Sequence, residues 1–83
     1  MILQDKTRCD CITDTHAIEV DFAGKFYEAI GQALYYAMHT GKRAGIMLII
    51  EEDSEVKYLD RLRAIVDHYG LPVDVWFVEN FIN

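Results

Sequence analysis

The feature that most constrains the fold is a pair of short alternating segments, residues 8–12 and 17–21, which flank a polar stretch at residues 13–16. Alternation of polar and apolar residues is typical of a β-strand, and the polar stretch suits a tight turn. If the strands pair around this turn, Asp10 lies directly opposite Glu19. Such neighbours have Cβ atoms about 4.5–5.5 Å apart, and like charges there are destabilising. A divalent cation between the carboxylates would remove the repulsion.

The same register gives each face of the hairpin a distinct character. It places Arg8 opposite Asp21 on the acidic face. The other face carries small or apolar side chains, and we expect it to contact the core: Cys9, Cys11, Ile18, Val20 and Phe22. The two cysteines lie two positions apart on one strand, so they point the same way and are poorly placed to form a disulfide with each other.

Downstream, the hydrophobic periodicity changes from that of a strand to that of a helix. Residues 24–40 repeat apolar side chains at helical spacing, and Gly41 is placed to end the helix. Residues 44–50 are then almost continuously apolar. That pattern is typical of a strand buried on both faces within a parallel sheet.

A second helix and a last strand complete the chain. Residues 51–54 supply negative charge and a capping residue to the start of the helix, Gly70 ends it, and residues 73–78 form the strand. With a short strand at residues 1–4, the predicted order is β-β-β-α-β-α-β. We therefore expect one α/β domain, residues 1–83, with a mixed sheet in which an antiparallel meander joins right-handed parallel crossovers.

The charge and hydropathy of the chain restrict its partners. Its net charge of -6 argues against a broadly basic surface for nucleic acid. A metal-dependent nuclease remains compatible, because cations held by carboxylates reverse the field that a phosphate meets. The longest apolar run, residues 46–50, is too short to cross a bilayer, and no signal peptide is visible. The sequence therefore predicts a reduced, cytoplasmic protein with no membrane partner.

The acidic pair of the hairpin suits phosphodiester hydrolysis. That reaction needs charge stabilisation on the phosphate and a deprotonated water, and hard cations bound to carboxylates supply both. We therefore expect Asp10 and Glu19 to bind Mg²⁺ or Mn²⁺, with Asp21 as a further oxygen ligand on the same face. The simpler alternative is that these carboxylates are solvated side chains on an exposed sheet face.

The helix after the hairpin carries a second group of candidates. Lys25, Ala29, Gln32 and Tyr36 follow one another at intervals of 4, 3 and 4 residues, so they line one face of the helix. Because this stripe begins just after the acidic strand, we expect Lys25 and Gln32 to face the carboxylates, where a lysine could position or deprotonate a water. Tyr36 is then a candidate for substrate contact.

His16, at the tip of the turn, is a further candidate for contact with a substrate phosphate, although an exposed turn residue is the simpler interpretation. A zinc site built from Cys9, Cys11 and His16 falls short of the usual number and spacing of ligands.

These residues resemble the PD-(D/E)xK nuclease superfamily, in particular its small RecB-like and Holliday-junction-resolvase-like members. The superfamily has an acidic residue on one hairpin strand, an acidic-x-Lys triplet on the next, and, in RecB-like members, a helix with Gln-x-x-x-Tyr. The corresponding residues here are Asp10, residues 19–21 and residues 32–36. The resemblance implies a restriction-endonuclease-like fold and a Mg²⁺- or Mn²⁺-dependent endonuclease, prokaryotic or from a phage, that cuts DNA, including branched DNA.

Two departures from the superfamily pattern bear on activity. Asp21 stands where the superfamily usually has lysine, and Lys25 is the candidate replacement. The sequence shows no sign of the N-terminal helix usual in the superfamily, which suggests a truncated or minimal domain whose exposed core a second copy would cover in a homodimer. The alternative interpretation is a catalytically inactive module of the same fold that acts in binding or assembly.

Overall fold

The computed structural model describes residues 10–81 and shows an α/β fold in which two helices lie on a four-stranded mixed sheet. The strands stand in the order β1-β2-β3-β4 across the sheet. In chain order the elements are β1 (Cys11–Ile12), β2 (His16–Phe22), η1 (Ala23–Lys25), α1 (Phe26–Thr40), β3 (Arg43–Ile50), η2 (Asp53–Glu55), α2 (Val56–Tyr69) and β4 (Val73–Glu79), where η denotes a 3-10 turn. The strand expected at residues 1–4 lies outside the described residues.

The hairpin has the register that the sequence predicts. Strand β1 pairs antiparallel with β2, with Cys11 opposite Ile18 and Ile12 opposite Ala17. The backbone N–H of Thr13 donates to the carbonyl oxygen of His16 at 2.8 Å and closes the turn. Continued by one residue, this register sets Asp10 against Glu19. Arg8, the expected partner of Asp21, lies outside the described residues.

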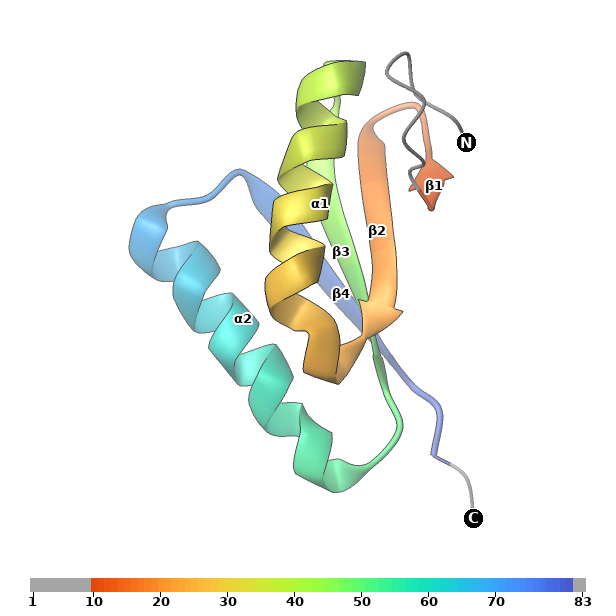
Figure 1. Cartoon of the computed structure of the whole chain (residues 1–83), viewed down its shortest axis with the longest axis vertical. Coiled ribbons are helices and arrows are strands. Elements are labelled where there is room, and N and C mark those ends of the chain that lie inside the picture. Colours follow the sequence, from red (N-terminus) through yellow and green to blue (C-terminus); the bar gives the residue numbers. More distant parts are fainter. Residues whose placement is uncertain (1–9, 82–83) are drawn as a thin grey trace.

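The rest of the sheet is parallel, and both helices cover the same face of it. Strand β3 lies between β2 and β4 and is parallel to each. Figure 1 shows α1 and α2 side by side in front of the sheet; no helix of the described residues lies on the other face, which is called the open face below. Each helix connects one strand to the next in the same direction across the sheet, so crossovers of one hand bring both helices to one side.

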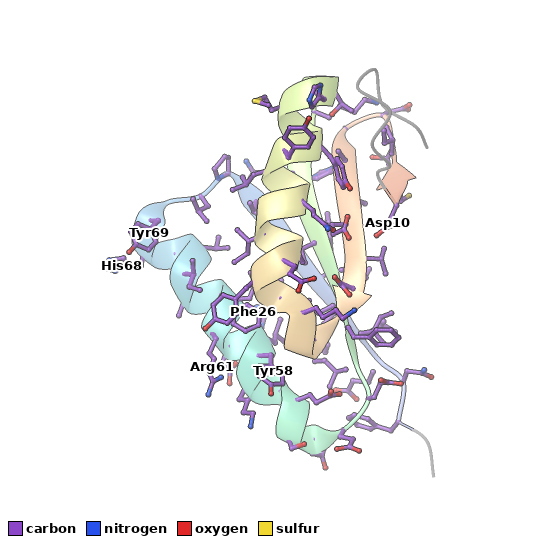
Figure 2. All side chains as sticks on the ribbon, viewed as in Figure 1. Asp10, Phe26, Tyr58, Arg61, His68 and Tyr69 are labelled. Carbon is purple, nitrogen blue, oxygen red and sulfur yellow. The ribbon has the colours of Figure 1, made fainter. Side chains whose placement is uncertain are left out.

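The core lies between this helix layer and β3. Its fully buried side chains come from alternate positions of β3 and from the inner faces of the helices: Phe26, Ala29, Ala33, Ala44, Ile46, Leu48, Ile50 and Leu62. Figure 2 shows Phe26 and Tyr58 between the two helices, and their ring centroids are 6.0 Å apart. The helical stripe expected in residues 24–40 is therefore the packing face of α1.

Two expectations about burial are wrong, and both concern the open face of the sheet. On β3, Met47 and Ile49 are only half-buried, so this strand is fully covered on one face alone. On β2, the apolar side was expected to meet the core, but Phe22 is 48% exposed and Cys11 on β1 is also exposed. The helices instead cover the side of β2 that bears Glu19, because the path of the crossover connections determines on which face of the sheet the helices lie.

The ends of the helices follow the expected signals. Gly41 and Gly70 adopt left-handed backbone angles, with φ of 66° and 61°, as C-terminal caps. At the other end of the second helical segment, Glu52 and Glu55 form a capping box around η2. Within residues 10–81, no helix combines the length and apolar character needed to cross a membrane.

Candidate active site between β2 and α1

Glu19 lies on the helix-covered face of β2. It stands in register with Ile46 of β3, and Asp21 stands in register with Leu48; both of these β3 side chains are fully buried. Glu19 is itself only 6% exposed, and it is the buried charged residue of the described chain. Burial of a carboxyl is costly unless the group is protonated, hydrogen-bonded or bound to a cation.

The surroundings of Glu19 hold its carboxyl in the protonated form. Burial is the main cause, and the charge of Asp10, a hydrogen bond to Asp10 and the charge of Asp21 act in the same direction. Together they raise the pKa of Glu19 to about 8. At neutral pH Glu19 consequently keeps its proton, as expected for a buried carboxyl group close to other acidic groups.

Asp10 is fixed in this position by the backbone of β2. Its Oδ2 atom accepts a hydrogen bond from the backbone N–H of Val20 at 2.9 Å. A side-chain oxygen of Asp10 thus accepts the hydrogen bond that a backbone carbonyl of a neighbouring strand would otherwise accept from Val20. The regular pairing of β1 with β2 begins at Cys11. Figure 2 shows Asp10 at the outer side of β2, beside the start of β1. Asp10 is exposed, so the acidic pair is open to solvent at this edge.

Asp21 is half-buried on the same face. Its Oδ1 atom accepts a hydrogen bond from the backbone N–H of Phe22 at 2.9 Å, close to the point where the chain leaves β2 for η1. The second carboxylate oxygen has no hydrogen-bond partner among the described residues. Asp21 is thus near enough to raise the pKa of Glu19 and retains an oxygen that could contact a cation.

The stripe of α1 that the sequence singled out lies over β2. Tyr36 packs against Ala17, which is fully buried. Helix α1 runs antiparallel to β2. Gln32 lies four helical residues, or about 6 Å, before Tyr36, and Glu19 lies two strand residues, or about 6.6 Å, beyond Ala17. Gln32 is therefore at the level of Glu19. Gln32 is exposed, which places it at the rim of the site rather than in the core.

Lys25 occupies the junction between η1 and α1, three residues after the end of β2. It is exposed and forms no hydrogen bond or ion pair with residues 10–81. Lys25 follows the acidic strand closely in the chain, but the described residues show no hydrogen bond or ion pair between it and the carboxylates that it was expected to face.

The sequence reasoning missed one residue of this region, Glu28. It lies in the first turn of α1, four residues before Gln32, and is exposed. By the same helical spacing it stands near the level of Asp21. The interval of four that joins Glu28, Gln32 and Tyr36 was the signal available in the sequence.

The structure separates His16 from the other candidates. Its Nε2 atom lies 2.7 Å from Oδ2 of Asp74 on β4, and its ring meets the ring of Trp76 edge-on at 5.3 Å. These partners lie on the open face of the sheet, whereas Glu19 lies under α1. Arg43 completes the cluster, with Nε 2.6 Å from Oδ2 of Asp74. His16 therefore belongs to an ion cluster on the opposite face.

The donor set of the acidic pair fits a hard divalent cation. Mg²⁺ characteristically takes one or two protein carboxylates and retains several waters, so Asp10 and Glu19 are a sufficient nucleus. Within residues 10–81 no group of three or more histidine, cysteine or carboxylate side chains is arranged as a metal cage. Glu19 would have to release its proton to bind a cation.

Comparison of the chain with models of known protein families, with curated proteins and with solved structures finds no significant match to any of them.

Proposed function

We propose that this chain is a Mg²⁺- or Mn²⁺-dependent DNA endonuclease with a restriction-endonuclease-like fold of the PD-(D/E)xK type. The observation that carries the proposal is the state of Glu19, a buried carboxyl group whose pKa is raised to about 8 beside Asp10 and Asp21. Such a group weakens the fold when it ionises. Strongly perturbed carboxyl groups are typical of functional sites.

In this proposal each side chain has a role that matches its position. Asp10 and Glu19 hold the cation, and Asp21 contributes an oxygen to it or to a bound water. The bound cation would stabilise negative charge on the phosphate and lower the pKa of a water molecule. Lys25, which has no partner among the described residues, orients or deprotonates the attacking water, and Gln32 at the rim contacts the phosphate.

Tyr36 has a supporting role in the same scheme. Its side chain packs on Ala17, as does that of Ile12, and this contact fixes the part of α1 that lies above the acidic pair. The hydrogen-bonding hydroxyl of a tyrosine anchored in this way is a suitable contact for the sugar-phosphate backbone.

A second candidate function is a module of the same fold that binds but does not cleave. The residue that favours it is Asp21, which occupies the place of the usual superfamily lysine. The two functions differ in metal binding, which can be measured. In the nuclease a cation must replace the proton of Glu19, whereas an inactive module that has lost its metal does not bind a cation there.

Cleavage of supercoiled and branched DNA in the presence of Mn²⁺ tests the proposal. We expect the native protein to nick DNA. Glu19→Gln should reduce the rate about 100-fold or more, because loss of a metal ligand should cost at least as much as the roughly 10–100-fold typical of the partners that only orient such ligands. The matched control is Asp60→Asn, an exposed carboxylate on α2, which should cleave at the native rate. Cleavage by Glu19→Gln at the native rate would overturn the assignment of this site.

Calorimetric titration with Mn²⁺ alone separates binding from catalysis. The native protein should bind the ion more tightly as the pH rises towards 8, because Glu19 must lose its proton. Glu19→Gln should show no binding at this site. Absence of any Mn²⁺ binding by the native protein at pH 8 would favour the inactive module.

A further inference from the structure

The two edges of the sheet differ in how well they are protected against pairing with another strand. At one edge, β1 has two residues within the described part of the chain, and the side chain of Asp10 accepts a hydrogen bond from the next backbone donor of β2, the N–H of Val20. At the other edge, β4 has seven residues, Val73–Glu79, with no proline, glycine or lysine among them. Natural edge strands are usually short, bulged, covered or charged. The centre of β4 carries no charge, and no strand of residues 10–81 pairs with its outer edge.

The backbone groups that β4 presents outward can be identified from its pairing with β3. The N–H of Asn80 donates to the carbonyl oxygen of Ile50 on β3 at 2.8 Å. Because N–H and C=O groups alternate in direction along a strand, the even-numbered residues of β4 face β3. The odd-numbered residues, with Val75 and Phe77 at the centre, direct theirs away from the sheet.

This outer edge is complementary to a second copy of itself. If two β4 strands pair antiparallel with full overlap, Trp76 lies opposite Trp76 of the partner and Val75 lies opposite Phe77 of the partner. The two acidic residues then avoid each other, because Asp74 faces Val78 and Glu79 faces Val73. The outward backbone groups of Val75 and Phe77 meet as a hydrogen-bonded pair.

The side chains of β4 are also arranged for such a contact. Phe77 is 43% exposed on the helix side, where the guanidinium of Arg63 lies 5.7 Å from its ring centroid. The indole of Trp76 leans inward over Gly45, away from the edge. Asp74 is neutralised by Arg43 within its own chain. The edge is therefore apolar and free of uncompensated charge at its centre.

We propose that β4 pairs antiparallel with β4 of a second copy about a two-fold axis at Trp76, which joins the two sheets into one. A two-fold axis is the commonest symmetry of soluble homo-oligomers, and it requires a self-complementary surface. The proposal is independent of the cleavage function, since the acidic pair lies beside β2 and β1, at the opposite edge.

Sedimentation equilibrium of the full chain tests this interface. The native protein should be a dimer, and Phe77→Glu should weaken dimerisation at least tenfold, because it introduces a charge at the paired edge. Arg63 offers that glutamate a partner within the folded monomer. The matched control is Phe22→Glu on β2, an exposed phenylalanine separated from β4 by β3, which should remain dimeric. A native protein that sediments as a monomer would overturn the proposal.

Amide hydrogen exchange of the native protein locates the interface without any substitution. In the dimer, the amides of Val75 and Phe77 should be protected as strongly as those of Trp76 and Val78, which bond to β3. If the protein is a dimer in which Val75 and Phe77 exchange as fast as the turn residue Asp14, the copies meet elsewhere and the proposed pairing is wrong.

Discussion

The indole ring of Trp76 lies directly over Gly45, so that a Cβ atom added to Gly45 would stand 2.7 Å from Cζ3 of the ring and 3.1 Å from Cγ1 of Ile18. A Cβ contact as short as the one to Trp76 essentially never occurs, and the one to Ile18 is tighter than most. The absence of a side chain at Gly45 therefore allows Trp76, the one tryptophan of the chain, to pack across β3 on the face of the sheet that no helix covers.

Substitution of Gly45 by alanine should displace Trp76. We expect Gly45→Ala to lower the free energy of unfolding by about 1–3 kcal/mol, as for other overpacked sites, and to shift the fluorescence of this single tryptophan. Gly31→Ala is the matched control, because nothing lies within 4 Å of its added Cβ. Within helix α1 that change should stabilise the protein by roughly 0.5–1 kcal/mol. Unchanged fluorescence in Gly45→Ala would contradict the packing described.

The stability of the protein should fall as the pH rises from 4.5 to 8. In the unfolded chain Glu19 ionises at its ordinary pKa of 4.5, whereas in the folded protein it keeps its proton up to about 8. The folded state therefore holds more protons in this interval, and its free energy of unfolding declines by up to about 1.4 kcal/mol per pH unit. Urea unfolding across this range measures the slope.

Glu19→Gln provides the control for that pH dependence. The amide does not ionise, so the variant should lose the decline between pH 4.5 and 8 and exceed the native protein in stability at pH 8. In the native protein, Mn²⁺ should raise the melting temperature more at pH 8 than at pH 5, since the cation competes with the proton. A native slope that persists in Glu19→Gln would assign the titration to another group.

Asp74→Asn should weaken the anchoring of β4 in neutral and mildly acidic solution. The hydrogen bonds from Arg43 and His16 lower the pKa of Asp74 to about 2. Because the folded-state pKa lies below the ordinary value of 3.8, this stabilisation is complete above 3.8 and is lost as the pH falls towards 2. We expect the variant to melt a few degrees lower than the native protein at pH 7 and at the same temperature below pH 2.

Lys25→Ala should separate catalysis from metal binding. Lys25 has no bond to another described residue, so its removal should leave the melting temperature and the affinity for Mn²⁺ unchanged. If it orients or deprotonates the attacking water, the cleavage rate should fall at least 100-fold, within the range for general acid–base groups. Lys57→Ala on α2 is the matched control. Native cleavage by Lys25→Ala would remove the lysine from the mechanism.

Local signals predicted most of the secondary structure. The turn at residues 13–16 and the alternation on either side determine the hairpin register, which is why the antiparallel pairing of Cys11 with Ile18 was predictable. Gly41 and Gly70 end their helices for a backbone reason that depends on no distant contact. The continuous apolar run of β3 indicated a central parallel strand, and β3 is paired on both sides.

The orientation of β2 was not predictable from its own residues. Its apolar side, with Val20 and Phe22, suggested the core, yet α1 covers the side with Ala17 and Glu19. The crossovers and the fully buried side chains of β3 determine which face of the sheet the helices cover. The side of β2 on that face is buried, whatever its own residues are.

The ion cluster on the open face was equally hidden in the sequence. His16 and Asp74 are 58 residues apart, and only the parallel order of β2, β3 and β4 brings them together. Contacts of this separation depend on the whole topology rather than on any local pattern.

The Asp74 cluster has a consequence for how the strands align during folding. Arg43 and His16 are the first residues of β3 and β2, and both reach the same carboxylate on β4. A slip of one residue along β2 would turn His16 away from Asp74 and would move Glu19 from beneath α1 to the open face. The cluster thus penalises misaligned pairing and selects the alignment that assembles the acidic site on the other side of the sheet.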